Sequence, residues 1–321
     1  MINDDSATED MLAPVDDGID IRLKHLSYSS TLTLHSCPRK FQLDKLREQV
    51  EDVAESSSNT TFAFGHVVGT GVQQIFEGLS FEKVLWNIFT GWHADLFAEN
   101  EKQLKSIWYA IHAVTKFYEM VVNNDFLAEY ELLYWNDKPA TELGFRITTP
   151  DNFKYRGFVD AVLRHRETGE IVVLEVKTTS SRNLNPAQYK NSAQALGYSV
   201  VLDVMVQDLS SYKVMYLVYK TQAMEWEVMP FNKTFLQRAQ WIQQLILDVE
   251  LVKRFEEVGV YPMYGESCFN YYSECEYFGL CTLNTSSLIQ PATKKTLERL
   301  AKETFAVELT LADLISAQLE K

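Results

Sequence analysis

The chain has 321 residues, of which 46% are hydrophobic and 12% aromatic, so it is long enough to bury one large core. Its formal net charge of −14 at pH 7 excludes attraction of a polyanion by a positive field over the whole surface, and any such contact must use local basic patches. No apolar run reaches membrane-spanning length and no signal-peptide pattern is seen, so we expect a cytoplasmic protein without membrane contact.

The first twenty residues form an acidic segment. They contain seven acidic residues and neither Lys nor Arg, which places half of the net charge there. Such a segment has too few apolar groups to fold, and we predict a disordered acidic tail over residues 1–25. The acidic residues are Asp4, Asp5, Glu9, Asp10, Asp16, Asp17 and Asp20.

Helices are predicted at three places in the first half of the chain. Residues 26–43 include a short helix that carries Cys37, and residues 62–79 form a second helix. Residues 81–124 are predicted to be a helical insertion that packs beside the core, because apolar residues recur there at helical spacing. That stripe consists of Ile107, Ile111, Val114 and Tyr118.

Strands follow in the middle of the chain. Two are predicted at 127–135 and 142–149. The next two runs, 157–163 and 171–179, show the period of two that is typical of strands, and a glycine-containing turn joins them. We therefore predict that these two runs form a β-hairpin.

The hairpin carries two carboxylates and a lysine at positions where a hydrophobic core would normally have apolar residues. Asp160 and Glu175 are expected on adjacent strands, and Lys177 follows Glu175 by two residues, on the same face of the sheet. Buried charges must be paired or must bind a metal ion. Two carboxylates can hold a hard divalent cation, and a lysine can orient an attacking water, which together suit phosphodiester hydrolysis. A solvated strand face with a weak charge contact is the structural alternative.

The second half of the chain is predicted to alternate helix and strand. A helix is expected at 185–204, with Gln194 and Tyr198 four residues apart on one face. The remaining elements are a strand pair at 211–220 and 224–231, an amphipathic helix at 231–258 and a helical extension at 286–321.

The four cysteines have a spacing that favours a metal site. Cys37 stands alone near the start, while Cys268, Cys275 and Cys281 follow one another near the end as C-x6-C-x5-C. In a reducing compartment four cysteines bind a metal more often than they form disulfides. A zinc site with four thiolates and four unrelated buried cysteines are the alternatives.

The ordered set of motifs resembles the PD-(D/E)XK nuclease superfamily. Asp160 stands for the first acidic residue and Glu175-Val176-Lys177 for the (D/E)-x-K signature. Gln194 and Tyr198 on the following helix resemble the Q-x-x-x-Y mark of RecB-type nuclease domains. The resemblance implies an α/β, restriction-endonuclease-like fold with a mixed central β-sheet flanked by helices. It places the nuclease domain at residues 26–285.

The sequence around the cysteines resembles the iron–sulfur branch of these nucleases. That branch includes the AddB subunit of bacterial double-strand-break repair and CRISPR-associated exonucleases. In that branch one upstream and three downstream cysteines hold a 4Fe–4S cluster. The resemblance implies that this cluster joins the helical N- and C-terminal parts, with Cys37, Cys268, Cys275 and Cys281 as ligands. The gap of six residues departs from the C-x2-C of the family, and zinc is the competing metal.

The resemblance also implies roles at the active site. Asp160, Glu175 and the backbone carbonyl of Val176 would hold Mg²⁺ or Mn²⁺, and Lys177 would position the attacking hydroxide. Gln194 and Tyr198 would steady the site and touch the nucleic-acid backbone. In related nucleases a histidine in the helix that corresponds to residues 62–79 binds the metal, but this chain has a glycine at that position. Three other residues are therefore candidates to complete the metal site. These are His66, Gln73 and Glu142.

These implications lead to an expected function. We expect a DNA exonuclease that acts on single strands or DNA ends in recombination, repair or phage DNA metabolism. A nuclease-inactive DNA-end-binding or scaffold subunit, and a zinc-stapled nuclease, are the alternatives. A protein partner could bind the C-terminal helix. Two basic patches are candidate DNA contacts: Arg39, Lys40, Lys45 and Arg47 form one, and Arg182 and Lys190 the other.

Overall fold

The chain forms two compact units. The computed structural model describes residues 17–47, 60–92, 104–123, 129–206, 212–270, 273–283 and 288–319. The first unit is drawn from segments 1–48, 146–156 and 243–315, and the second from 49–145, 157–242 and 316–321. All four cysteines belong to the first unit, and the charged residues of the predicted hairpin belong to the second.

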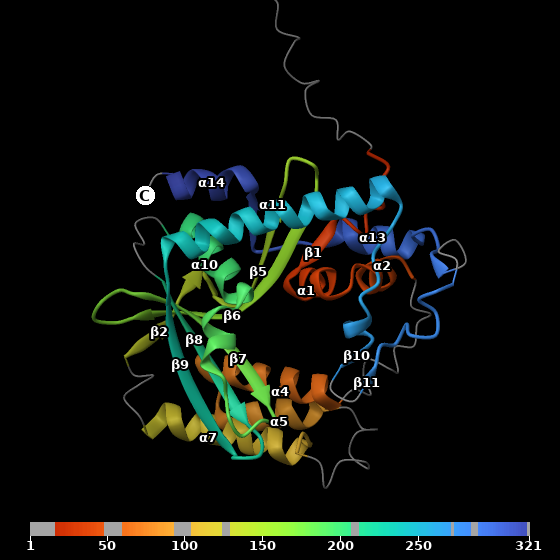
Figure 1. Ribbon diagram of the computed structural model, residues 1–321. Helices are drawn as coiled ribbons and strands as arrows, with labels where there is room; N and C mark the ends of the chain where they lie inside the picture. The colour runs from red at the N-terminus through yellow and green to blue at the C-terminus, as the bar shows by residue number, and fades with distance from the viewer. Residues whose placement is uncertain are drawn as a thin grey trace, which may run out of the picture. The chain divides into compact units, whose positions relative to one another are not determined.

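A mixed sheet is the frame of the second unit (Figure 1). Its central strands are β6 (Lys154–His165), β7 (Ile171–Thr179), β8 (Tyr212–Lys220) and β9 (Glu225–Lys233). The pairs β6–β7 and β8–β9 are antiparallel, whereas β7–β8 is parallel. The predicted hairpin and the later strand pair are therefore confirmed. The first four residues of β7 are fully buried, as expected for a strand with neighbours on both sides.

Further strands extend the sheet on the other side of β6. The strand order is β12-β5-β6-β7-β8-β9, and β1 and β2 also pair with β6. The bounds are β1 His25–Ser27, β2 Tyr130–Leu132, β5 Thr141–Thr148 and β12 Val307–Thr310; a separate small hairpin joins β3 Tyr134–Trp135 and β4 Lys138–Pro139. The predicted helical extension at 286–321 therefore includes a strand, β12.

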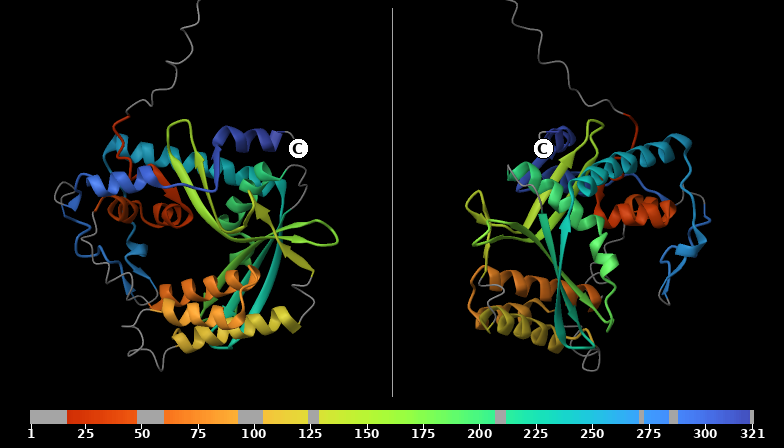
Figure 2. Two further views of the ribbon diagram at one scale, coloured as in Figure 1. Left: turned by 180° about the vertical axis from the view of Figure 1, so that it is seen from behind. Right: turned by 60° about the vertical axis from the view of Figure 1, so that its left-hand side comes forward.

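Three helices form one layer against a face of this sheet (Figures 1 and 2). They are α4 (Thr60–Phe76), α5 (Phe81–Gly91) and α7 (Ile107–Asn123), and their buried residues share one apolar cluster with β6, β7 and β8. A Cβ atom at Gly71 of α4 would lie 2.7 Å from a methyl group of Val114 of α7, so a glycine is needed where these helices touch. The region predicted as an insertion beside the core is thus part of the core.

A crossover connection joins the parallel strands β7 and β8. It contains α9 (Pro186–Lys190) and α10 (Ala193–Met205), and α10 contacts both strands. The prediction of a single helix at 185–204 is wrong in one respect, because the helix is interrupted at Asn191 and Ser192. Asn191 ends α9 and Ser192 begins α10 as its N-cap, a position that serine favours.

A buried polar network fixes the far end of α10. The carboxylate of Asp203 accepts hydrogen bonds from Arg238 (2.9 Å), Tyr212 (2.8 Å) and Gln318 (2.7 Å). Arg238 lies on α11 (Phe235–Val258), and Gln318 lies on α14 (Leu311–Leu319). Because a buried carboxylate is tolerated only with such partners, these contacts hold α10 beside β8 in the second unit.

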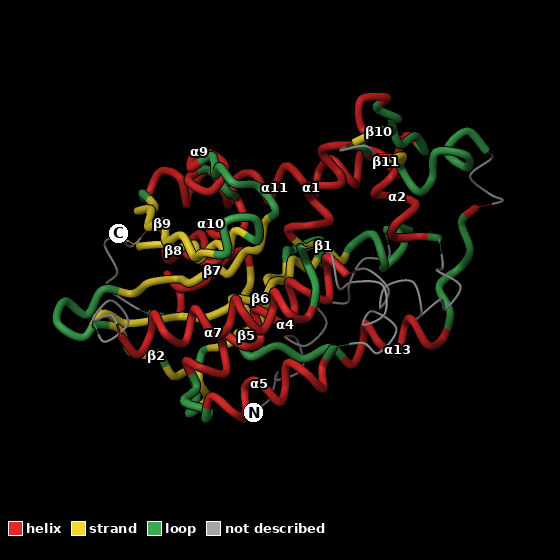
Figure 3. The backbone as a smooth tube through the Cα atoms, turned by 90° about the horizontal axis from the view of Figure 1, so that it is seen from below, coloured by secondary structure: helices red, strands yellow, loops and turns green. Residues whose placement is uncertain are grey.

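Short elements make up much of the first unit (Figure 3). Cys37 separates helices α1 (Tyr28–Ser36) and α2 (Pro38–Leu46), and it is the N-cap of α2. The later cysteines follow the C-terminal part of α11. Three short elements surround them: the 3₁₀ turn η1 Gly265–Ser267 and the strands β10 Phe269–Asn270 and β11 Ser273–Glu274. Helix α13 (Lys294–Lys302) also belongs to this unit.

The end of the predicted acidic tail belongs to the folded unit. Asp17 forms an ion pair with Lys24 at 2.7 Å, Asp20 pairs with Arg22 at 2.8 Å, and Leu23 is fully buried. The boundary predicted at residue 25 is therefore too late. Residues 1–16 lie outside the described residues, and the expectation of a disordered tail is untested there.

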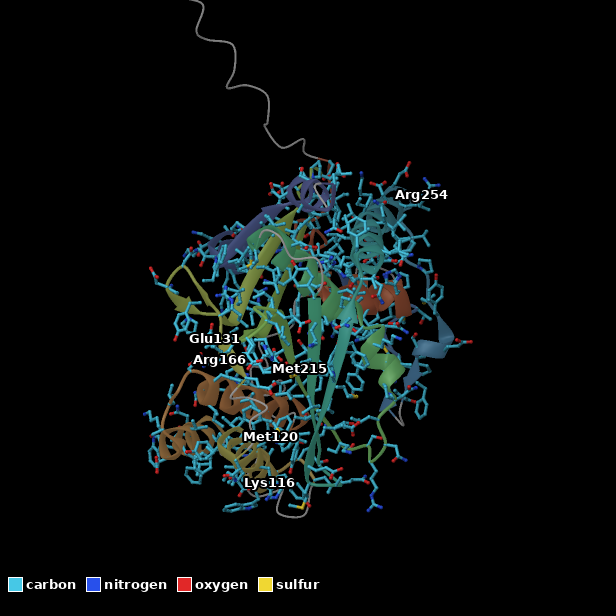
Figure 4. All side chains as sticks on the ribbon, turned by 90° about the vertical axis from the view of Figure 1, so that its left-hand side faces the viewer. Lys116, Met120, Glu131, Arg166, Met215 and Arg254 are labelled. Atoms are coloured by element: carbon cyan, nitrogen blue, oxygen red, sulfur yellow. The ribbon has the colours of Figure 1, made fainter. Side chains whose placement is uncertain are left out.

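Exposed ion pairs are found on the surface of the second unit. Lys116 of α7 pairs with Glu119 at 2.8 Å, and Arg166 pairs with Glu131 at 3.0 Å (Figure 4). Such solvated pairs contribute about 0–1 kcal/mol each. Within the described parts of the chain, we find no helix with the length and apolarity needed to cross a membrane.

Candidate functional site

The site forms where strands β6 and β7 separate. Their paired register runs from Arg164↔Ile171 to Ala161↔Leu174. One step further, the backbone N–H of Val176 donates to the carboxylate of Asp160 at 2.7 Å. The Asp160 side chain thus accepts the hydrogen bond that a backbone carbonyl of β6 would accept in a regular sheet. The backbones of β6 and β7 are no longer paired from this point on, which leaves an open edge on β7.

Glu175 and Lys177 extend the site along β7, as predicted. The side chain of Glu175 is 1% exposed, and its Oε1 lies 2.5 Å from Nζ of Lys177. Its second oxygen, Oε2, is buried and has no hydrogen-bond partner among the described residues. A buried carboxylate oxygen without a donor is costly, which leaves this atom available for a cation.

The pKa shifts of the two carboxylates also favour a bound cation. Burial raises the pKa of Asp160 well above its usual value, and the nearby Glu175 carboxylate raises it further. Burial also raises the pKa of Glu175, although Lys177 opposes this shift. Glu142 adds a third negative charge that acts on both. One lysine does not balance this set, so a bound cation would be stabilised here.

The shifted pKa values predict how metal-free stability depends on pH. Asp160 binds its proton more tightly in the folded than in the unfolded state, so folding stability is lost as pH rises through the raised folded-state pKa. We expect the free energy of unfolding of metal-free protein to fall over that range, and Asp160→Asn to flatten the decline. Denaturant titrations at a series of pH values test this; an unchanged slope in Asp160→Asn would contradict it.

A chain of polar contacts joins β7 to helix α10. Lys177 Nζ donates to Gln194 Oε1 at 3.0 Å, and Gln194 Nε2 donates to the hydroxyl of Tyr198 at 2.7 Å. The structure therefore brings together all five residues proposed for the active site. Gln194 and Tyr198 hold the lysine in place from the helix that follows its strand.

Two residues that the sequence analysis did not identify support Tyr198. Its ring packs edge-on against Phe145 of β5, with ring centroids 5.9 Å apart. A Cβ atom at Gly157 of β6 would lie 2.7 Å from the Phe145 ring, closer than such atoms pack. In the sequence, the only indication was a glycine three residues before Asp160. The contact with Phe145 explains why a glycine is needed there.

This packing predicts the effect of Gly157→Ala. The added methyl group must displace Phe145 and with it Tyr198, so we expect a loss of about 1–3 kcal/mol of unfolding free energy and slower cleavage. Chemical denaturation and a cleavage assay measure the two effects. Gly69→Ala on α4 is the matched control, because its Cβ would meet no atom within 4 Å. If both variants behave alike, Gly157 does not set the position of Tyr198.

Glu142 is held near the carboxylates by an unusual backbone conformation. Its φ angle is +44°, in the left-handed region that residues other than glycine rarely adopt. Its Oε1 accepts a hydrogen bond from the buried Gln73 at 2.9 Å. Gln73 thus positions Glu142, whereas His66 is exposed on α4. Of the three candidates to complete the metal site, Glu142 is the one whose charge acts on Asp160 and Glu175.

No ready-made metal site of three or more His, Cys, Asp or Glu side chains exists among the described residues. The donors of the hairpin nevertheless fit a hard divalent cation, because two carboxylates converge and one buried oxygen lacks a donor. A backbone carbonyl, such as that of Val176, could complete such a set.

The four cysteines all belong to the first unit. All four are free thiols; Cys37 is buried and the other three are partly buried. Burial raises the pKa of Cys281, and Cys37, Cys268 and Cys275 raise it further through their charges, so the four lie within electrostatic reach. The backbone N–H of Cys275 donates to the carbonyl of Cys268 at 2.8 Å. Soft thiolates are the donors that iron–sulfur clusters and zinc both use.

Protein contacts also bring the cysteine segments together. The backbone N–H of Arg39 donates to the carbonyl of Pro262 at 3.0 Å, and Ser267 Oγ donates to the carbonyl of Ser36 at 2.6 Å. Lys40 pairs with both Asp44 and Glu276. These bonds place the segment before Cys268 against the helices on either side of Cys37.

The two predicted basic patches differ in how exposed they are. In the first patch, Arg39 is buried and Lys40 is committed to carboxylates, so these two residues are engaged in internal contacts. The prediction of a DNA-contact patch is therefore wrong for Arg39. Arg182 and Lys190, in the connection after β7, are both exposed.

Comparison with known proteins gives one family match. A model of the PD-(D/E)XK nuclease superfamily matches residues 25–282. No curated protein matches the sequence. Among solved structures, the protein designated SSO0001 is 15% identical with a TM-score of 0.34, over 83% of this chain and 88% of that chain. A protein from Eubacterium rectale described as a candidate exonuclease is 11% identical with a TM-score of 0.47, over 92% of this chain and 100% of that chain.

Proposed function

Since the family model covers residues 25–282, the chain belongs to the PD-(D/E)XK nuclease superfamily, and we propose that it is a metal-dependent DNA exonuclease. The observation that carries the proposal is a set of contacts along β7: Asp160 accepts from the N–H of Val176, and Lys177 contacts both Glu175 and Gln194. These contacts involve the two carboxylates, the lysine and the helix residue in the order that the family motif requires.

Asp160, Glu175 and the carbonyl of Val176 would hold Mg²⁺ or Mn²⁺. The N–H of Val176 is directed to Asp160, and the N–H and C=O of one strand residue point to the same side, so this carbonyl faces the open edge of β7. When bound, the divalent cation would polarise a phosphoryl oxygen and lower the pKa of a bound water.

The protein groups supply position and charge. Lys177 is 39% exposed, so its ammonium group reaches solvent while Glu175 and Gln194 fix its place. It would orient the attacking water and balance negative charge that builds on the phosphoryl oxygens. Exposed Arg182 and Lys190 would contact the DNA backbone next to this site.

For the cysteines we propose a 4Fe–4S cluster held by Cys37, Cys268, Cys275 and Cys281. The electrostatic effect of the other three cysteines on Cys281 supports a single site, but the described residues do not form a ready-made set of three ligands. Zinc is the alternative occupant. A cluster at this place would tie the start of the chain to its C-terminal part, and we propose a structural role for it.

A nuclease-inactive DNA-end-binding subunit is the second candidate. The family contains the residues needed for hydrolysis, and this chain retains them: Asp160 accepts a hydrogen bond from the N–H of Val176, and Glu175 pairs with Lys177. Retention of all three residues at the positions of the motif favours the enzyme. A pathway in recombination, repair or phage DNA metabolism, and a protein partner at the C-terminal helix, remain predictions.

The exonuclease part of the proposal is tested by comparing DNA topologies. We expect linear DNA, labelled at one end, to release short labelled products early in the reaction, while covalently closed circular DNA of the same sequence stays intact. Labels at the 5′ and 3′ ends, in separate reactions, give the polarity. Equal cutting of circular and linear DNA would identify an endonuclease instead.

A further inference from the structure

Several basic side chains surround one carboxylate in the first unit. His25 of β1 interacts electrostatically with Lys45, Lys154 and Arg156, and Glu303 is the carboxylate among them. Arg299 of α13 also acts on Lys45. We call these five basic residues the basic cluster: His25, Lys45, Lys154, Arg156 and Arg299. All of them, and Glu303, belong to the first unit.

Strand pairing explains why these residues meet. Strand β1 runs parallel to the start of β6, with His25 opposite Lys154 and Ser27 opposite Arg156. Side chains two residues apart on a strand share a face, so His25, Lys154 and Arg156 are on one face of the pair. Lys45, near the end of α2, approaches from outside the sheet and donates a hydrogen bond to the carbonyl of His25.

The cluster has more positive charge than its carboxylates neutralise. Arg156 donates a hydrogen bond to Glu303 Oε1, but Lys45, Lys154 and Arg299 form no ion pair among the described residues. Two carboxylates near the cluster have other partners. Asp44 pairs with Lys40 and Glu308 pairs with Arg146.

His25 is the most unusual member. It is 3% exposed, and neither ring nitrogen has a hydrogen-bond partner among the described residues. The nearest carboxylate oxygen, on Glu303, lies 4.0 Å from Nδ1, which is too far for a hydrogen bond. A buried imidazole with two unsatisfied nitrogens costs free energy and is rare unless a ligand can satisfy it.

Burial and the surrounding cations shift both titratable bases. Burial, Lys154 and Arg156 lower the pKa of His25 to about 4, against a raising effect of Glu303. Burial and Arg156 lower the pKa of Lys45 to about 8, although Asp44 and Glu303 raise it. A more highly charged anion in the place of the Glu303 carboxylate would relieve this repulsion.

A phosphate group matches the donors better than a carboxylate does. It carries about −1.5 to −2 charges at pH 7 and more acceptor oxygens than one carboxylate. A guanidinium, ammonium groups and an imidazole are the usual phosphate donors, and charge-assisted hydrogen bonds to them are strong. Arg156, with a side chain that is 31% exposed, and the exposed Arg299 leave the cluster in contact with solvent.

We propose that the basic cluster is a phosphate-binding site in which the Glu303 carboxylate occupies the place of the phosphate. Two sources share this chemistry: inorganic phosphate and a phosphomonoester at the end of a DNA strand. Phosphate binding itself stands on the cluster alone, whereas DNA as its source rests on the proposed nuclease function.

Calorimetric titration of the full-length protein with inorganic phosphate, in EDTA and at constant ionic strength, tests the proposal. Glu303→Gln removes the competing charge but keeps an acceptor oxygen for Arg156, so we expect phosphate to bind about tenfold more tightly than in wild type. Lys154→Gln removes one cation and should weaken binding about tenfold. Arg254→Gln is the matched control, because Arg254 belongs to the same unit and forms an exposed ion pair with Glu257 (Figure 4).

Oligonucleotides distinguish the two sources. Strands that carry a 5′-phosphate, a 3′-phosphate or only hydroxyl ends are compared in EDTA. A preference for one phosphorylated end that Lys154→Gln loses and Arg254→Gln keeps would assign the site to that DNA end. If inorganic phosphate binds and no end preference is found, the site takes free phosphate. If neither wild type nor folded Glu303→Gln binds phosphate above a chloride control, the proposal is overturned, whether or not the protein cleaves DNA.

Discussion

Replacement of Lys177 by alanine is expected to slow DNA cleavage by about 10²- to 10⁴-fold, the range typical for loss of a positioned acid–base group. Its ammonium group contacts both Glu175 and Gln194, so it stands between the carboxylates and the supporting helix. Without it the pKa of Glu175 should rise further, because Lys177 has the largest lowering effect on it. Single-turnover cleavage at saturating enzyme measures the effect directly.

The matched control for this variant is Lys116→Ala. Lys116 is also a half-exposed lysine paired with a glutamate in the second unit, but it lies on α7. We expect Lys116→Ala to cleave at the wild-type rate and both variants to bind DNA in the absence of divalent metal. Near-normal turnover in a folded Lys177→Ala protein would show that the lysine of the signature is not catalytic here.

The second large effect is expected at the cysteines. If they hold one cluster, Cys37→Ser removes the only ligand from the N-terminal part and opens a loop of roughly 230 residues. By the entropy argument developed for cross-links, closing so long a loop is worth on the order of 5 kcal/mol. We expect anaerobically purified wild-type protein to contain iron and sulfide and to absorb in the visible, and Cys37→Ser to lose both iron and stability.

Ser36→Ala provides a control for the same segment. It leaves the carbonyl of Ser36 to accept from Ser267 and removes only an exposed hydroxyl. This variant should keep the iron content and stability of the wild type. Stoichiometric zinc in a colourless protein would favour the zinc alternative, and absence of any metal with unchanged stability in Cys37→Ser would contradict a metal staple.

The sequence was sufficient for the hairpin and its charges. Apolar runs bounded by turn residues define β6 and β7, and a charge inside such a run must be paired or must bind a ligand. The positions of Asp160, Glu175 and Lys177 therefore followed from strand periodicity. Gln194 and Tyr198 also followed, because a spacing of four residues on a helix defines a shared face.

Other features depend on contacts between residues far apart in the chain. The positive φ of Glu142 and its bond to Gln73 have no local sequence signature. The basic cluster could not be predicted either, since Lys154 comes close to His25 only when β1 pairs with β6. Likewise, Arg39 resembles a surface charge in the sequence, and only tertiary packing buries it.

The most direct test of the central claim is digestion of end-labelled linear DNA by wild type and by Glu175→Gln, each with Mg²⁺, Mn²⁺ or EDTA. Glutamine keeps the size of the buried Glu175 side chain but removes the charge that would hold the metal. We predict cleavage by wild type with a divalent metal, none in EDTA, and none by a folded Glu175→Gln protein under any condition. Cleavage by Glu175→Gln at the wild-type rate would contradict the proposed active site.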